Sequence, residues 1–142
     1  MSQVGAMLYE DITKTIIGRS FELINELGSG FLESVYEKSL YLLLTQSGLE
    51  VKCQHPIAVH FRGVCVGEFY ADLLVEDKVI IELKSVKAIS SEHQVQVIHY
   101  LMATGLEVGL LINFGRPKLE YKRLTRNQLF SLGANDEIDE AF

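Results

Sequence analysis

The chain has 142 residues, of which 48% are hydrophobic, and a formal net charge of −6. This length suffices for one buried core but is short for two, so we expect a single domain over residues 1–132 followed by an acidic tail over residues 133–142. No run approaches the ~18 apolar residues of a membrane-spanning helix, and the N-terminus lacks a secretory pattern, which favours a cytoplasmic protein.

The negative charge is unevenly distributed along the sequence. Four acidic residues lie in the tail and three more belong to the candidate site described below; without these seven carboxylates the formal charge rises from −6 to +1. One stretch near the C-terminus is basic. Its cations, with one lysine from an earlier loop, are candidate contacts for nucleic-acid phosphates, although solvated surface charge is the commoner role: Lys87, Arg116, Lys118, Lys122, Arg123 and Arg126.

Two helices are predicted in the N-terminal third. Apolar residues recur at intervals of three and four from Leu8 to Leu27, which indicates an amphipathic helix that ends at a Gly-Ser-Gly sequence. A second helix is expected from Leu32 to Gln46, with Gly48 just beyond its end.

Three strands are predicted next, because β-branched residues become frequent. Residues 51–61 and 64–75 are expected to form a hairpin about a two-residue turn at Arg62-Gly63, and residues 79–84 a third antiparallel strand. A regular hairpin would set Cys65 opposite His60 and Cys53 opposite Asp72, so both thiols are expected to be free.

The C-terminal third is predicted to add a helix and two strands. A capping box between Ser91 and Gln94 begins a helix that Gly105 ends, and an almost wholly apolar strand follows over residues 107–114. Residues 119–124 are a candidate last strand and residues 125–132 a candidate short helix. The order predicts an α/β (α+β) fold, with a mixed central β-sheet that contains a three-stranded antiparallel meander and is flanked by helices.

Acidic residues on the second and third strands suggest a metal site. Glu82 and Lys84 share one face of the third strand, and a three-residue turn over residues 76–78 would set Asp72 directly opposite Glu82. Two such carboxylates repel each other unless one is protonated or a cation such as Mg²⁺ lies between them. Lys84 could then orient an activated water or neutralise charge on a phosphate. Alternatively, Glu82 and Lys84 form an ordinary surface ion pair; their position at the end of an apolar strand favours the site.

Two sequence motifs resemble a known nuclease family. Gly30-Phe31-Leu32-Glu33-Ser34-Val35-Tyr36 matches the pattern of the GxxExxY proteins, and Asp72 with Glu82-Leu83-Lys84 resembles the metal motif of the PD-(D/E)XK nuclease superfamily to which they are assigned. The resemblance covers residues 12–124. It implies a restriction-endonuclease-like fold and a nuclease that uses Mg²⁺ or Mn²⁺ and an activated water to hydrolyse phosphodiester bonds of DNA or RNA.

The resemblance also assigns roles to individual residues. The metal ligands would be Asp72, Glu82, the carbonyl of Leu83 and, directly or through water, Glu33, although a glutamate in a first helical turn is favoured by the helix dipole in any case. Gln96-x-x-x-Tyr100 is similar to the motif of RecB-like nucleases, in which the Gln supports the site and the Tyr approaches the nucleic acid; a plain solvent-facing Gln is the alternative. The catalytic set would then be Glu33, Asp72, Glu82, Lys84, Gln96 and Tyr100.

Other residues of these segments have structural interpretations. Tyr36 is expected in the core, Gly30 at a sharp entry into the second helix, and His93 and His99 at the surface.

Two other functions compete with the nuclease hypothesis. The chain could be a non-enzymatic module that binds nucleic acid or protein with the same fold, or it could hydrolyse a small phosphodiester, which would suit its acidic charge. Its small surface is also limiting for a duplex, and a homo-oligomer would enlarge it. The choice between DNA and RNA, and between internal and terminal cleavage, stays open.

Overall fold

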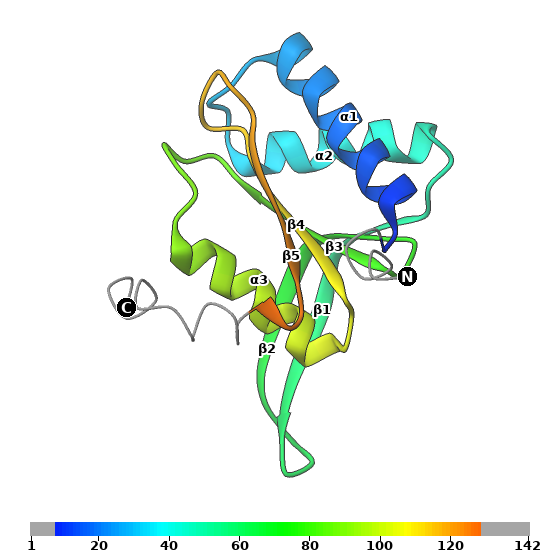
Figure 1. Cartoon of the computed structure of the whole chain (residues 1–142), viewed down its shortest axis with the longest axis vertical. Helices are drawn as coiled ribbons and strands as arrows, with labels where there is room; N and C mark the ends of the chain where they lie inside the picture. The colour runs from blue at the N-terminus through cyan, green and yellow to red at the C-terminus, as the bar shows by residue number, and fades with distance from the viewer. Residues whose placement is uncertain (1–7, 129–142) are drawn as a thin grey trace.

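A computed structural model describes residues 8–128 as a five-stranded mixed sheet with helices on both faces (Figure 1). The strands lie in the order β1-β2-β3-β4-β5, in which only the β3–β4 pair is parallel. The predicted α+β class, the meander and the crossover through a helix are confirmed. The elements are α1 (Glu10–Leu27), α2 (Glu33–Gln46), β1 (Val51–Phe61), β2 (Val64–Val75), β3 (Val79–Lys84), α3 (Ser91–Thr104), β4 (Val108–Asn113) and β5 (Glu120–Thr125).

The β1–β2 hairpin has the predicted two-residue turn, but its register changes along its length. Arg62 and Gly63 both have positive φ, 52° and 81°, as the tightest hairpin turns require, and His60 lies opposite Cys65 as predicted. Between His60 and Val59 the register shifts by one residue. The prediction that Cys53 faces Asp72 is therefore wrong: Cys53 faces Leu73, because a β-bulge adds one residue to β2. Both cysteines are free and exposed.

The turn between β2 and β3 has the predicted three residues. Val75 pairs with Val79 and Leu73 with Ile81, so residues 76–78 form the connection. Glu76 and Asp77 adopt left-handed φ values of 56° and 54° in this turn. The same register sets residue 72 level with residue 82.

Helix α3 begins with a different capping box from the predicted one. The N-cap is Ser90, whose Oγ accepts a hydrogen bond from the backbone N–H of His93, while Nδ1 of His93 accepts one from the backbone N–H of Ser90. The prediction that Ser91 and Gln94 form the box is wrong by one residue, because a histidine nitrogen can take the role usually given to Glu or Gln. The helix predicted over residues 125–132 and the acidic tail lie mostly or wholly outside the described residues.

The core has a layer on each side of the sheet. Helices α1 and α2 cover one face, where Ile16, Tyr36 and Leu40 pack on alternate residues of β2, β3 and β4. Helix α3 covers the other face through Val97, Ile98, Tyr100 and Leu101. The turn end of the β1–β2 hairpin projects beyond these layers (Figure 1). No helix in residues 8–128 has the length and apolar character of a membrane span.

Candidate active site

Two carboxylates bridge β2 and β3 just beyond their last paired residues, Leu73 and Ile81. The backbone N–H of Asp72 donates to Oε1 of Glu82 at 3.0 Å, and the backbone N–H of Leu83 donates to Oδ2 of Asp72 at 2.8 Å. Each carboxylate thus accepts a hydrogen bond from the strand opposite its own. This exchange holds Asp72 and Glu82 side by side, as the three-residue turn predicts.

Burial and nearby negative charges make both carboxylates difficult to ionise. The Glu82 side chain is buried, and this burial, followed by the charge of Asp72, raises its pKa to about 8. Burial is also the main cause that raises the pKa of Asp72, against hydrogen bonds from the Leu83 backbone and the Gln54 side chain. At neutral pH the pair therefore retains a proton unless a cation compensates the second charge.

Lys84 and Glu33 lie close enough to act on both carboxylates. The charge of Lys84, two residues after Glu82, lowers the pKa of Asp72 and of Glu82, whereas the charge of Glu33 at the start of α2 raises both. The structure thus brings four predicted residues together from three elements. In residues 8–128, no group of three or more His, Cys, Asp or Glu side chains is arranged to hold a metal, so direct ligation by Glu33 stays a prediction.

The Gly30–Tyr36 motif fixes the position of Glu33. The Tyr36 hydroxyl donates to the carbonyl of Gly28 at 2.6 Å and accepts from the backbone N–H of Phe31 at 3.1 Å, while its ring stacks on Phe114 at 4.4 Å. Gly30 has a φ of 92° and donates to the carbonyl of Phe114 at 3.0 Å. The core role predicted for Tyr36 and the sharp entry predicted for Gly30 are confirmed, and both tie the start of α2 to the end of β4.

Sequence reasoning missed two residues of the site, Glu37 and Gln54. Nε2 of Gln54 donates to Oε1 of Glu37 at 2.9 Å and to Oδ1 of Asp72 at 3.3 Å. Burial raises the pKa of Glu37, which the Gln54 hydrogen bond opposes and the charge of Asp72 reinforces. Glu37 lies four residues after Glu33 and so on the same helix face, a spacing that could have identified it. Gln54 has a φ of 50°, a backbone conformation that no feature of the local sequence predicts.

Helix α3 brings Gln96 and Tyr100 to the same site. Burial, then the charges of Glu82 and Asp72, raise the pKa of the Tyr100 phenol, and the Gln96 side chain opposes this as a hydrogen-bond partner. Tyr100 also packs in one buried cluster with Ala71, next to Asp72, and with Ile80, two residues before Glu82. Of the two histidines expected at the surface, His99 is exposed and His93 is only partly exposed because it caps the helix.

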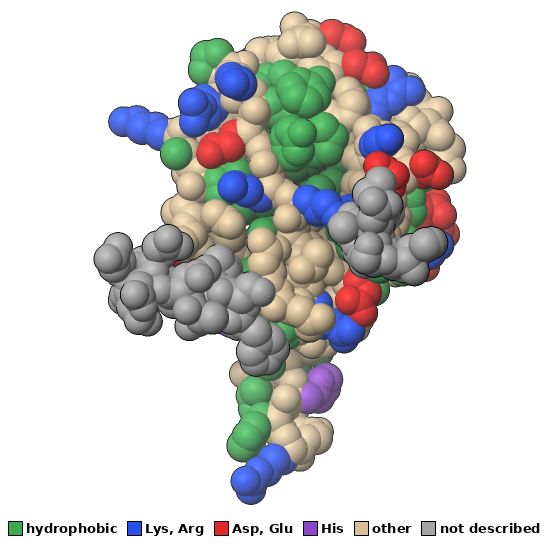
Figure 2. Space-filling model, in the orientation of Figure 1, with side chains coloured by type: hydrophobic (Ala, Val, Ile, Leu, Met, Phe, Trp, Pro, Cys, Tyr) green, Lys and Arg blue, Asp and Glu red, His purple; other side chains and the backbone are tan. Residues whose placement is uncertain are grey.

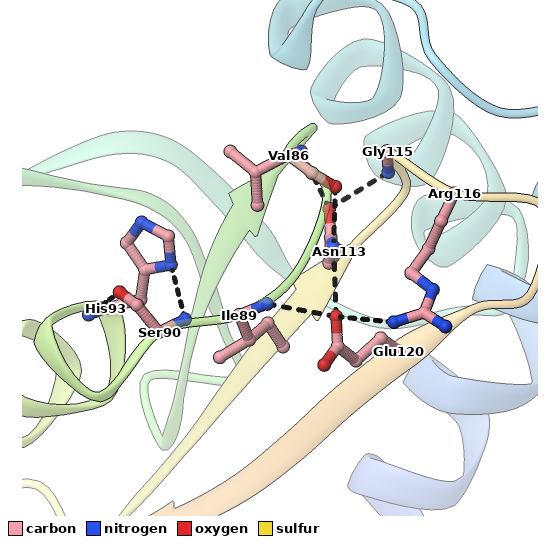
Figure 3. Close-up of polar contacts among 8 residues, drawn as sticks. All are labelled: Val86, Ile89, Ser90, His93, Asn113, Gly115, Arg116 and Glu120. Atoms are coloured by element: carbon pink, nitrogen blue, oxygen red, sulfur yellow. Dashed lines mark hydrogen bonds and ion pairs between the residues drawn. The ribbon is translucent and has the colours of Figure 1, made fainter.

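A second polar cluster, the Asn113 cluster (Asn113, Glu120 and the backbone of Val86, Ile89 and Gly115), fixes the loop between Lys84 and α3 (Figure 3). Oδ1 of Asn113 accepts from the N–H groups of Val86 and Gly115 at 3.0 and 2.9 Å, and Nδ2 donates to the Val86 carbonyl and to Oε1 of Glu120 at 2.9 and 3.1 Å. Gly115 lies against the Val86 backbone so closely that a Cβ would come within 2.2 Å of it. This cluster thus sets the path of the chain directly after Lys84.

The cations predicted to contact phosphate fall into two groups in the structure, those with partners within the protein and those that are exposed. Arg123 donates to the carbonyl of Leu8 at 2.7 Å and Arg126 pairs with Glu107, which gives both a role in holding segments together. Arg116 lies 3.9 Å from Glu120. The side chains of Lys87, Lys118 and Lys122 are exposed. Figure 2 shows Lys and Arg side chains interleaved with acidic and hydrophobic ones instead of joined in one patch, so a continuous phosphate track is not evident on this face.

Comparison with known proteins identifies a family. A family model described as the PD-(D/E)XK nuclease superfamily matches residues 10–124. No curated protein matches the chain. Its structure is similar to the crystal structure of SSO0001, at 15% identity and a TM-score of 0.51 over 65% of this chain and 48% of that one. The alkaline exonuclease LHK-Exo from Laribacter hongkongensis matches at 14% identity and a TM-score of 0.45, over 76% of this chain and 62% of the exonuclease. The chain thus spans about half of the first protein and under two thirds of the second, and the likeness to SSO0001 supports the fold alone.

Proposed function

Because this chain belongs to the PD-(D/E)XK nuclease superfamily, we propose that it is a nuclease that hydrolyses phosphodiester bonds of DNA or RNA with a divalent cation. The observation that carries the proposal is the pair of adjacent carboxylates beside Lys84. Burial and repulsion raise the pKa of Glu82 to about 8 and also raise that of Asp72. Two carboxylates with raised pKa values do not stabilise the folded state unless a cation binds between them.

The donor set of this pair fits a small hard cation. Mg²⁺ is commonly bound by one or two carboxylates together with water and substrate phosphate, so it does not require a cage of three side chains. Asp72 and Glu82 would hold the ion, with the carbonyl of Leu83 and, through water, Glu33. Such an ion supplies Lewis-acid activation of water and neutralises charge at the phosphate.

The other residues of the site would act on the substrate. Lys84 supplies a fixed positive charge beside the carboxylates, where it stabilises the negative charge that develops on a phosphate under attack. Gln96 and Tyr100 belong to α3, which packs on the face of the sheet opposite to α1 and α2. They would position the nucleic-acid strand relative to the carboxylates. The Tyr100 phenol stays protonated and can donate a hydrogen bond, because its pKa is raised.

The proposal is tested by the activity of the purified full chain on plasmid, linear duplex and single-stranded DNA and RNA, with Mg²⁺ or Mn²⁺ and with EDTA. We expect cleavage that requires the cation and that Lys84→Ala reduces by about 100- to 1,000-fold, as loss of a group that stabilises the transition state does. Lys14→Ala is the matched control, because Lys14 is exposed and paired with Glu10 on α1.

The same proteins separate the competing functions. Titration with Mn²⁺ should give binding in the wild type that Glu82→Gln weakens, whether or not a substrate has been found. Salt-dependent binding of oligonucleotides without cleavage of any substrate would contradict the nuclease proposal and favour a non-enzymatic nucleic-acid-binding module.

A further inference from the structure

A groove of about 810 Å³ lies between the β1–β2 hairpin and α3. The hairpin contributes His60 and Phe69 to its lining, and α3 contributes Gln96, His99, Tyr100 and Met102. Its volume is within the range of sites that bind organic ligands. Figure 1 shows the hairpin extending past the body of the sheet. Its residues Ala58, Val59, His60 and Phe69 line one side of the groove.

Two aromatic side chains pack against each other in the lining of the groove. The rings of Phe69 and Tyr100 lie 5.9 Å apart at an interplanar angle of 37°. Phe69 is 47% exposed and Met102 is 46% exposed. Leaving such side chains in water has a cost in free energy, and a flat apolar ligand would remove that cost by covering them.

The groove adjoins the candidate active site. Gln96 and Tyr100 line the groove, and Tyr100 also packs in one buried cluster with Ala71, next to Asp72 in β2, and with Ile80, two residues before Glu82 in β3. If the phosphate of a bound molecule lies at the carboxylates, the neighbouring part of that molecule can therefore enter the groove.

We propose that the groove binds the unpaired bases of a single nucleic-acid strand beside the phosphate to be cut, with one base stacked on Phe69. The chemistry of the lining favours bases over phosphates: it contains aromatic rings, imidazoles and a thioether, and it has an acidic side chain, Glu92, but no Lys or Arg to bind a backbone phosphate. In a duplex the faces of the bases are covered by their neighbours, so only an unpaired strand can offer one to Phe69. This inference rests on the proposed nuclease function, because it gives the substrate class of that site.

Binding of labelled oligonucleotides by the Lys84→Ala protein tests the proposal without cleavage. We expect Phe69→Ala in this background to weaken binding of single-stranded DNA or RNA about 5- to 150-fold, the usual effect of losing one stacking platform. Phe69→Trp should retain binding. Phe61→Ala should leave it unchanged, since Phe61 is an even more exposed phenylalanine of the same hairpin, at 62%, that does not line the groove.

A fluorescent adenine analogue placed along the strand reports stacking directly. We expect its fluorescence to be quenched at one position by the Lys84→Ala protein and restored by Phe69→Ala. Equal losses from Phe61→Ala and Phe69→Ala, or an equal effect of Phe69→Ala on a duplex, would overturn the inference.

The two proposals fail in different ways. If the wild type cleaves nucleic acid and Phe69→Ala leaves kcat/KM for single strands unchanged, the groove proposal is wrong and the nuclease stands. If single strands bind with the expected quenching and nothing is cleaved, the groove stands and the nuclease does not. Phe69→Leu, which keeps an apolar side chain without a stacking face, guards against a folding defect and should also weaken binding.

Discussion

Two buried polar clusters lie in the same sheet, and they differ in how their polar groups are compensated. In the Asn113 cluster a neutral amide that is fully buried meets two backbone N–H donors, a carbonyl and a carboxylate. In the acidic pair, Asp72 and Glu82 each accept a backbone hydrogen bond but still face another negative charge. Both clusters use side chains to link segments of backbone.

The titration of the carboxylates in the two clusters shows the difference. Burial tends to raise the pKa of Glu120, but hydrogen bonds from Asn113 and Ile89 and the charges of Arg116 and Lys122 outweigh it, so that its pKa is lowered. No comparable set of donors and cations compensates Glu82, whose pKa rises to about 8. A cluster with complementary partners stabilises the fold, whereas one with repelling charges lowers stability and is retained at functional sites.

The largest expected effect is a pH dependence of stability that comes from the acidic pair. The folded protein binds the Glu82 proton more tightly than the unfolded chain does. The contribution of this proton to the free energy of unfolding is therefore fully present below about pH 4.5 and is lost as the pH rises to about 8. At about 1.4 kcal/mol per pKa unit, the free energy of unfolding should fall by up to about 5 kcal/mol over this interval in EDTA. Urea unfolding at several pH values measures it.

Glu82→Gln provides the comparison for this measurement. The amide keeps an acceptor for the Asp72 N–H but has no proton to lose, so the slope that wild type shows between pH 4.5 and 8 should largely disappear. Addition of Mn²⁺ should also reduce the slope in the wild type. Identical slopes in the wild type and in Glu82→Gln would show that the pair is not under electrostatic strain.

The Asn113 cluster should show a smaller effect that depends little on pH between 6 and 8. Asn113→Ala leaves the partly buried backbone N–H groups of Val86 and Gly115 without their acceptor and removes one donor from Glu120, which should lower the free energy of unfolding by about 2–4 kcal/mol. Urea unfolding and the melting temperature report it. Glu120→Gln, which retains an acceptor for Asn113 and Ile89, should cost about 1 kcal/mol or less. A change below that for Asn113→Ala would contradict the stabilising role.

The smallest expected effect concerns Gln54, which connects Glu37 to the acidic pair. Its amide lowers the pKa of Asp72, so Gln54→Ala should move the acidic limb of the pH–activity profile upwards and reduce kcat about 3- to 10-fold. Stability should change by less than about 0.5 kcal/mol, because Gln54 is exposed. Gln46→Ala, at the exposed end of α2, is the control. An unchanged pH profile would remove Gln54 from the site.

The elements that the sequence predicted well are those encoded by local patterns. The bounds of β1, β2 and β3 follow from β-branched residues and turn signals, and the odd length of the turn over residues 76–78 follows from requiring Asp72 and Glu82 to share a face. The start of α2 at Glu33, one turn before Tyr36, was predicted equally well from the sequence. Local propensity and side-chain alternation are properties of neighbouring residues, so the order of residues is enough to reveal them.

The tertiary structure alone decided contacts between residues distant along the chain. The β-bulge that moves Cys53 opposite Leu73 and the 17-residue and 18-residue separations across which Gln54 meets Glu37 and Asp72 leave no periodic signal. Arg123 and Arg126 looked like phosphate contacts because their charge is visible in the sequence, whereas their partners Leu8 and Glu107 are brought to them by folding. The sequence determined which chemical groups are present and on which face of each strand they lie; folding determined which of them are compensated.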